Sequence, residues 1–334
     1  MRTMRFAVLV ALSSMLACPG LAEKGPRTYR LLTRADFDGL VCAILLRQIG
    51  VADEVRFAHP KEFQDGRVKV TSRDILANVP YVPGCAMTFD HHASEQSRFQ
   101  GKPPPNFILD LKAPSAARLV YDFYGGAKRF PKVPSEMMEA VDKANRASFG
   151  YEEILRPKGW TLLAYILDPR TGLDGLGKLK TTIQQMVEQL VEFGPTHSIA
   201  QILDHPAVKE RADLYRVEVD QCIAQIRRLA VVKKSVVILD LRKEKTIRAG
   251  NRFLIYALNP TCNVSIDVLW GDQKKKVVLA LGKSITNRTC LADLGALALQ
   301  YGGGGHVNAA SCQVAPADAE RVLGELVAKL NAPR

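Results

Sequence analysis

Between residues 28 and 121, short apolar runs alternate with stretches of helical pattern, and this alternation restricts the fold more than any other feature of the sequence. Each run is short enough for a buried strand, and a helix that ends in glycine is predicted between the first two, over Leu40–Gly50. Such a rhythm is typical of a parallel sheet covered by helices. The predicted strands are Tyr29–Thr33, Val55–Ala58, Val68–Ser72, Ala86–Phe89 and Phe107–Leu109.

The pattern changes twice in the second half of the chain. Helical patterns dominate from Ala113 to about Val232 and end in a helix predicted over Ala207–Arg228. Short strands then follow, so we predict an α/β protein in which a helical linker joins a parallel-sheet domain to a smaller α/β domain. The late strands are predicted over 235–241, 253–258, 263–269, 277–281 and 312–314, with helices over 291–300 and up to about Leu330. The predicted boundaries are 1–27 for an N-terminal extension, 28–200 for the catalytic domain, 201–233 for the linker and 234–334 for a substrate-binding domain.

Acidic residues stand at the predicted carboxyl ends of three strands in the first domain. Asp36 and Asp38 follow the first strand, Asp74 follows the third, and Asp90-His91-His92 follows the fourth. Ligands of open parallel sheets bind at this edge, so we expect the three loops to meet in one crevice. Carboxylates that lie so close together repel one another unless a divalent cation lies between them.

The side chains of these clusters indicate which metal would bind. Carboxylate oxygens mixed with an imidazole suit Mn²⁺, with Mg²⁺ or Co²⁺ as substitutes. The seven cysteines occur singly, without a CxxC pair, which argues against a structural zinc site and against a redox motif. We therefore expect a manganese-type site in the crevice.

A second set of candidate residues lies in the smaller domain. Gly302-Gly303-Gly304-Gly305 precedes His306, and four glycines let an anion approach consecutive backbone amides closely. Upstream, Ser284 and Arg288 lie in a donor-rich loop, where Arg288 could hold a phosphate through two hydrogen bonds. Taken alone, that loop is compatible with ordinary solvent exposure, whereas the glycine run with its histidine predicts a phosphate-binding turn.

The chain is basic, with a formal net charge of +12. The cations are spread along the chain and not gathered in a tail, which favours anionic partners such as phosphorylated small molecules or nucleic acid without choosing between them. Apolar residues make up 47% and charged residues 24%, the composition of a globular protein in water.

The first 22 residues have two interpretations. Arg2 and Arg5 precede an apolar run up to Ala17, and Gly20-Leu21-Ala22 could be a cleavage site, which together outline a secretory signal peptide. Alternatively, translation begins at Met15 and the segment lies upstream of the true start. The run is too short to span a bilayer, and the unpaired cysteines favour a reducing compartment. We therefore expect a cytoplasmic protein without a membrane span, with export as the alternative.

Four motifs together resemble the DHH phosphoesterase superfamily, in its branch with a C-terminal DHHA1 domain: Asp36-Phe37-Asp38-Gly39, Asp74, Asp90-His91-His92 and the glycine run before His306. The resemblance extends from about Thr28 to Leu330 and points to the exopolyphosphatase-like and oligoribonuclease-like branch. It implies two metal ions, which we expect to be Mn²⁺, bound by Asp36, Asp38, Asp74, His91 and Asp142. Asp74 would bridge the two ions, and Asp110 is the less favoured alternative to Asp142.

The resemblance also implies roles for the remaining candidates. Asp90 would orient the histidines, and His92 would face the phosphate. The His that many relatives have before the first aspartate is absent here, and Arg34 could supply a positive charge in its place. Predicted to be catalytic are His92, Asp90, Arg288 and His306; predicted to bind substrate are Ser284, Gly303, Gly304, Gly305, His306 and Arg34.

The predicted function is metal-dependent hydrolysis of phosphoester or phosphoanhydride bonds in small phosphorylated substrates, such as nucleotides or short single-stranded oligonucleotides. One alternative is an exopolyphosphatase or pyrophosphatase acting on inorganic polyphosphate. Another is a non-catalytic module that binds nucleotides or nucleic acid, supported only by the absent His. A homodimer is compatible with the sequence.

Overall fold

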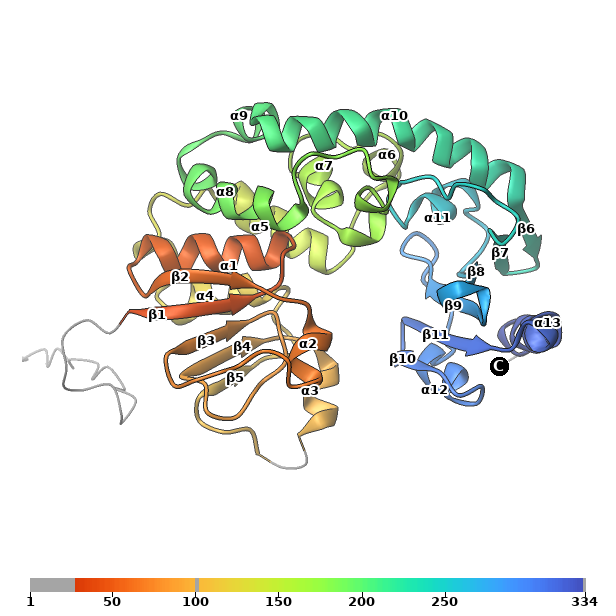
Figure 1. Ribbon diagram of the computed structural model, residues 1–334, viewed down its shortest axis with the longest axis horizontal. Helices are drawn as coiled ribbons and strands as arrows, with labels where there is room; N and C mark the ends of the chain where they lie inside the picture. The colour runs from red at the N-terminus through yellow and green to blue at the C-terminus, as the bar shows by residue number, and fades with distance from the viewer. Residues whose placement is uncertain (1–27, 100–101, 333–334) are drawn as a thin grey trace, which may run out of the picture.

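The computed structural model describes residues 28–99 and 102–332, which form two lobes joined along one side by a long helix (Figure 1). A five-stranded sheet lies in the first lobe and a six-stranded sheet in the second. The segment 1–22, with its two interpretations, lies outside the described residues. Within the described ranges, no helix is long and apolar enough to cross a membrane.

The first sheet consists of β1 (Tyr29–Thr33), β2 (Ala52–Phe57), β3 (Asp74–Ala77), β4 (Met87–Asp90) and β5 (Phe107–Leu109). All neighbouring strands are parallel, in the order β2-β1-β3-β4-β5. The chain moves from β1 to β2 on one side and places β3, β4 and β5 on the other, so the order reverses between β1 and β3. Ligands of such sheets bind at the carboxyl ends of the strands at this switch point.

Helix α1 (Phe37–Gln48) lies between the first sheet and further helices, and its residues from Phe37 to Leu46 are all buried. Asp36 caps its first turn by accepting a hydrogen bond from the Gly39 backbone. Glycine is required there because a Cβ would lie 1.9 Å from the Arg34 carbonyl oxygen. This packing fixes the loop that carries Asp36 and Asp38.

The first lobe and its edge contain several further helices. They are α2 (Pro60–Gln64), α3 (Ala93–Arg98), α4 (Ala116–Phe123), α5 (Ser135–Asn145), α6 (Tyr151–Leu155), α7 (Gly159–Ile166), α8 (Ile183–Phe193) and α9 (Ile199–Asp204). Helix α10 (Pro206–Leu229) then extends from the first lobe to the second (Figure 1). It matches the linker helix predicted over Ala207–Arg228. Short 3-10 turns occur at Gly126–Lys128, Pro169–Thr171, Asp174–Leu176, Gly194–Thr196, Asp272–Lys274 and Pro316–Asp318.

The second sheet consists of β6 (Ala230–Lys233), β7 (Val236–Asp240), β8 (Val264–Trp270), β9 (Val277–Lys283), β10 (Gly304–His306) and β11 (Ala309–Val314), in the order β10-β11-β9-β8-β7-β6. The helices of this lobe are α11 (Leu254–Leu258), α12 (Leu294–Leu299) and α13 (Ala319–Asn331). Val264, Ile266 and Val268 alternate along β8 and pack in one apolar cluster with residues of α12 and α13. The residues between them, Ser265 and Asp267, therefore belong to the opposite face.

The predicted fold class is confirmed, whereas two predicted strands are wrong. Residues 68–72 form a loop, and the strand begins at Asp74, because the apolar run Ile75–Ala77 pairs with both β1 and β4. Residues 253–258 are mainly the helix α11, whose start is fixed when the Asn251 side chain accepts a hydrogen bond from the Phe253 backbone. The first error moves Asp74 to the opposite end of a strand.

Candidate active site

Loops from three strands meet at the carboxyl edge of the first sheet. The loop after β1 carries Asp36 and Asp38, and the loop after β4 carries His91 and His92, as predicted. Between them, the residue that follows β3 is Asn78, which the sequence analysis did not identify. Its backbone has a positive φ of 58°, and its side-chain amide donates a 2.9 Å hydrogen bond to Asp36.

Asp36 is surrounded by donors from three directions. Its Oδ1 accepts hydrogen bonds from the Gly39 backbone at 3.0 Å and from Asn78, and its Oδ2 lies 3.1 Å from Nε of Arg34. Burial raises the pKa of this carboxyl, and the charge of Arg34 opposes that effect. Arg34 therefore supplies a positive charge beside the first aspartate, which is compatible with its predicted place in the site.

Asp38 and His91 face each other in the interior. Asp38 accepts hydrogen bonds from the backbone amides of Ala116 and Ala117, at the amino end of α4, at 3.0 and 2.8 Å. Its Oδ2 lies 3.6 Å from Nε2 of His91, an atom that is buried and has no hydrogen-bond partner in the described chain. Burial and the negative charge of Asp36 raise the pKa of Asp38 to about 7, while burial and the neighbouring His92 lower the pKa of His91 to about 4.

Asp90 organises the two histidines, as predicted for its position. Its Oδ1 accepts hydrogen bonds from the backbone amides of His91 and His92 at 2.7 and 3.1 Å, and it lies 2.6 Å from Nδ1 of His92. Burial lowers the pKa of His92, but the hydrogen bond to Asp90 and the nearby carboxylates outweigh burial, so the pKa is raised. Asp90 thus fixes the His92 ring through Nδ1 and favours its charged form.

The site contains ligand atoms that suit a divalent cation. No group of three His, Cys, Asp or Glu side chains in the described chain is close enough to surround a metal ion. However, the unpartnered Nε2 of His91 lies opposite Oδ2 of Asp38, and these two atoms could both coordinate one divalent cation. Asp36 is the adjacent carboxylate, although its oxygens already contact Arg34 and Asn78.

The structure does not bring Asp74 to this site. Asp74 is the first residue of β3 and pairs with Arg30, whereas the site lies beyond Ala77 at the other end of the strand. At about 3.3 Å per residue, the two ends are about 10 Å apart. The Asp74 carboxylate accepts hydrogen bonds from the Arg30 side chain at 2.7 and 3.1 Å and from the Thr71 backbone at 2.6 Å. It therefore fastens the amino end of the sheet and is not free to bridge two ions.

Asp142 is also occupied by other partners. It lies on α5, where its carboxylate accepts hydrogen bonds from both Nε and Nη2 of Arg118 at 2.9 and 2.6 Å and from the hydroxyl of Ser115 at 2.7 Å. Ser115 caps α4, the helix whose first amides hold Asp38. Asp142 thus supports the site through α4, and its predicted role as a metal ligand stays a prediction.

Groups from both lobes line a cavity of about 800 Å³, the sheet cavity. Arg288, predicted to bind phosphate, lies here and donates a 3.3 Å hydrogen bond across the lobes to the Ala147 carbonyl. Ser284 lies here too, but its hydroxyl accepts hydrogen bonds from the backbone amides of Thr286 and Asn287. Ser284 therefore shapes the loop that presents Arg288.

The glycine run begins in a turn at Gly302 and continues into the edge strand β10 with Gly304 and Gly305. Gly303 and Gly305 pack so closely against β11 that a Cβ on either would lie within 2.4 Å of a backbone atom. Gly304 has open space around it and lines the sheet cavity. With His306, it also lines a second cavity of about 560 Å³, the histidine cavity, into which His92 comes from the first lobe. The two predicted catalytic histidines therefore share one cavity.

A small cavity of about 60 Å³, the loop cavity, connects the carboxylates to the sheet cavity. Asp36 and Asp38 line it, and Asn145, Arg170 and Arg252 line both it and the sheet cavity. Asn145 and Arg252 were not predicted, because nothing in the local pattern distinguishes them from ordinary helix-end and turn residues. The sequence Asp168-Pro169-Arg170-Thr171 has a turn signature that is compatible with a position near the cleft, and Arg170 does line both cavities.

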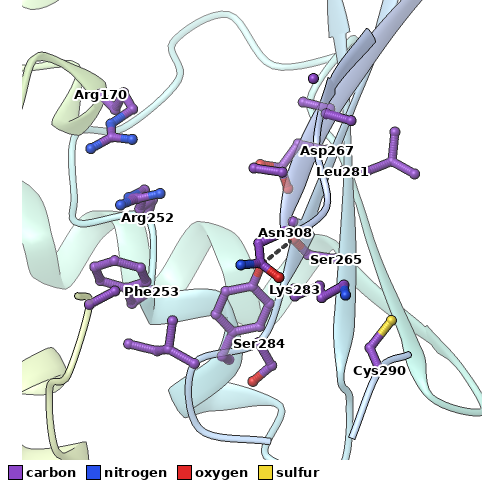
Figure 2. Close-up of a pocket in the computed structure, with 18 of the residues that line it drawn as sticks. Arg170, Arg252, Phe253, Ser265, Asp267, Leu281, Lys283, Ser284, Cys290 and Asn308 are labelled. Carbon is purple, nitrogen blue, oxygen red and sulfur yellow. Dashed lines mark hydrogen bonds between the residues drawn. The ribbon is translucent and has the colours of Figure 1, made fainter. Parts of the chain in front are cut away.

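Two basic side chains of the sheet cavity, Arg170 and Arg252, lie beside the same carboxylate. Asp168 accepts hydrogen bonds from Nε and Nη2 of Arg170 at 2.7 and 2.8 Å and lies 3.8 Å from Nε of Arg252. Burial and the charge of Arg170 lower the pKa of Arg252 to about 10. Figure 2 shows both arginines across the cavity from Asp267 and Ser265 of β8. An anion would relieve the repulsion between the two arginines.

Comparisons with known proteins indicate the family of the chain. No protein-family model and no curated protein matches the chain. Among solved structures, a pGpG-specific phosphodiesterase, PggH from Vibrio cholerae, is 47% identical with a TM-score of 0.81, over 91% of this chain and 99% of that one. A DHH domain described as a member of the s1p family of ribosomal proteins shares the fold, with a TM-score of 0.59 and 11% identity over 92% and 88% of the two chains. An exonuclease RecJ bound to manganese matches with a TM-score of 0.48 and 15% identity over 91% of each chain.

The identity to the phosphodiesterase extends over both lobes of this chain, and the Asp90-His91-His92 triplet lies at the end of β4 beside Asp36 and Asp38. The predicted family and the prediction that the chain is an enzyme are both confirmed. The chain belongs to the DHH phosphoesterase superfamily and is a phosphoester-hydrolysing enzyme.

Proposed function

We propose that the protein hydrolyses the phosphodiester bond of short 5′-phosphorylated oligonucleotides, with the dinucleotide pGpG as the first candidate substrate. The support for pGpG is the 47% identity to a pGpG-specific phosphodiesterase over 99% of that protein. Cleavage between the bridging phosphorus and the 3′ oxygen would add one water and release two molecules of GMP.

One divalent cation is part of the proposal, held by Asp38 and His91 with Asp36 as the adjacent carboxylate. Mixed carboxylate and imidazole donors suit Mn²⁺, with Mg²⁺ or Co²⁺ as substitutes. Such a cation supplies Lewis-acid chemistry, polarising the phosphate and activating water. We propose a single ion because two of the predicted ligands lie elsewhere or have other partners: Asp74 lies at the other end of β3, and Asp142 is held by Arg118.

The remaining steps belong to side chains of the protein. The His92 ring, fixed and charged through its Nδ1 contact with Asp90, neutralises negative charge on the phosphate and can donate a proton from Nε2 to the leaving oxygen. Arg170 and Arg252 bind non-bridging oxygens from the first lobe and its junction, while Arg288 and His306 do so from the second. Because these groups come from two lobes, substrate binding would hold the lobes together.

The observation that carries the proposal is that the three cavities adjoin one another. Asn145, Arg170 and Arg252 are shared by the loop and sheet cavities, and Gly304, Gly305 and Asn308 by the sheet and histidine cavities. A single substrate can therefore place its phosphate beside Asp38 and its nucleoside groups in the two larger cavities. Inorganic polyphosphate would use only the basic side chains and would leave the rest of the sheet cavity empty.

A direct assay separates these substrates. The protein is incubated with pGpG, pApA, polyphosphate and pyrophosphate, with and without Mn²⁺, and the products are quantified by chromatography. We expect GMP from pGpG in the presence of the metal, and loss of turnover in His92→Ala. Release of phosphate from polyphosphate or pyrophosphate, without turnover of either dinucleotide, would replace the proposal with the alternative function.

A further inference from the structure

The floor of the sheet cavity is an open sheet face made of small residues. Ser265 on β8 pairs with Gly282 on β9, and Gly282 in turn pairs with Ala309 on β11. Next along the same face, Ala280 lies between Asp267 and Ser311. The opposite face carries the large apolar residues that pack with α12 and α13. Small residues leave room over the floor for a flat group to lie against the sheet.

The ceiling of this space is kept at a fixed distance from the floor. The Tyr256 hydroxyl, from α11, forms a 2.9 Å hydrogen bond with the Ser265 hydroxyl. A Cβ at Gly282 would lie 2.6 Å from the same Tyr256 oxygen, so only glycine is accommodated beneath it. The contact between α11 and the sheet thus closes one end of the cavity, with Asp267 on the floor beside it.

Asp267 on this floor has a carboxylate to which the described residues of the protein provide no partner. Its Oδ1 is buried without a hydrogen-bond partner, and no described residue forms a hydrogen bond or an ion pair with the carboxylate. Burial alone raises its pKa to about 6, without a compensating cation. Asp267 is half-buried, and a carboxylate with a buried, unpaired oxygen is costly to a fold, so its presence in the wall of a cavity points to a ligand that donates hydrogen bonds.

We propose that Asp267 recognises the Watson–Crick edge of a guanine base that lies on the floor of the sheet cavity. An ionised carboxylate only accepts hydrogen bonds, and guanine presents two adjacent donors, N1–H and the exocyclic amino group. Adenine and cytosine place an acceptor beside their amino group, and uracil has a single donor between two acceptors. A carboxylate therefore selects guanine among the four bases.

The position of the basic side chains agrees with this assignment. Arg170 and Arg252 lie across the cavity from Asp267 (Figure 2), so a nucleotide with its base on the sheet can direct its phosphate toward them. Those arginines also line the loop cavity beside Asp36 and Asp38. The assignment rests on the proposed function, because it places one base of the substrate whose phosphodiester bond is cleaved beside Asp38.

The test is equilibrium binding of mononucleotides to the full chain without added metal, by calorimetry. Wild-type protein is expected to bind GMP about 10- to 100-fold more tightly than AMP, with IMP between them because it keeps N1–H and lacks the amino group. In Asp267→Asn, the GMP affinity is expected to fall by that factor while the AMP affinity changes by less than about twofold. Asp272→Asn, which removes an exposed carboxylate from the same lobe, is expected to bind like wild type.

Two outcomes would overturn the assignment. One is wild-type protein that does not prefer GMP over AMP, through equal binding or through no binding of either. The other is Asp267→Asn that keeps the preference or loses both nucleotides equally. Turnover of pGpG is measured separately with metal present: GMP preference without turnover would refute the proposed function alone, and turnover without GMP preference would refute the guanine site alone.

Discussion

Nε2 of His91 lies 3.6 Å from Oδ2 of Asp38, and this nitrogen has no hydrogen-bond partner among the described residues, whereas Oδ2 accepts a hydrogen bond from the Ala116 backbone. With the pKa of His91 lowered to about 4 by burial and the neighbouring His92, the ring is neutral at pH 7, so one of its two nitrogens has a free lone pair. In the tautomer in which that nitrogen is Nε2, two lone-pair-bearing atoms face each other in the interior. A proton or a metal cation between them removes the repulsion, which makes this pair the centre of the site.

Substitution of His91 by alanine should abolish that centre without unfolding the protein. We expect pGpG hydrolysis to fall by at least about 100-fold, and Mn²⁺ binding measured by calorimetry to be lost. His59→Asn is the matched control, because His59 is exposed, lies outside the site and caps α2 in a way that Asn can replace. Near-normal turnover in His91→Ala would remove His91 from the mechanism.

Asp74→Asn should reduce stability and not activity. Removing the partner of Arg30 is expected to lower the free energy of unfolding by about 1–3 kcal/mol in denaturant titration, with kcat unchanged within about twofold. Burial raises the pKa of Asp74, but the hydrogen bonds from Arg30 and Thr71 lower it by more, so the pKa lies below its ordinary value. The stabilisation is therefore present above about pH 4 and is lost as the pH falls, so variant and wild type should converge in acid. Loss of metal binding at unchanged stability would restore Asp74 as a ligand.

Asp74 and Asn78 show which parts of the site could be predicted from the sequence and which could not. The strands that carry Asp36, Asp38 and Asp90 have clear apolar runs, so their loops were predicted at the correct edge of the sheet. In the third strand, Val68 packs in a buried cluster although its segment is a loop, and this apolar signal competed with the true strand over Ile75–Ala77. A shift of several residues then exchanged the two ends of the strand.

In the second lobe, prediction from the sequence failed for a different reason. The apolar run at 253–258 has no period that distinguishes a buried strand from a buried helix turn, and its environment makes it α11. The Gly304–His306 strand has no apolar residue at all, and only its pairing with β11 creates it. Arg170 and Arg252 likewise enter the site through long-range packing, which a local pattern does not contain.

Arg288→Lys should weaken substrate binding more than catalysis. The guanidinium reaches the Ala147 carbonyl in the other lobe while still lining the sheet cavity, and a lysine has no planar pair of donors for both tasks. We expect KM for pGpG to rise about tenfold with kcat reduced by less than about threefold. An equal fall in kcat with an unchanged KM would indicate that Arg288 acts only in the transition state.

Asp267→Asn should stabilise the protein in the absence of nucleotide. The pKa of Asp267 is raised to about 6 by burial, so folding penalises the ionised form. The penalty is complete above about pH 6 and disappears as the pH falls toward the unfolded value of about 4. The variant should gain on the order of 2 kcal/mol at pH 7 and nothing near pH 4, measured by thermal unfolding at both pH values. Destabilisation at pH 7 would mean that the carboxylate has a partner within the protein.

The central claim is that one divalent cation at Asp38 and His91 supports cleavage of a 5′-phosphorylated dinucleotide. The most direct measurement is a titration of metal-free protein with Mn²⁺ in which bound metal and GMP release from pGpG are recorded on the same samples. We expect activity to rise in proportion to the first equivalent of Mn²⁺ and to be complete near one ion per chain. Turnover that begins only after a second equivalent binds, or turnover without any bound metal, would contradict it.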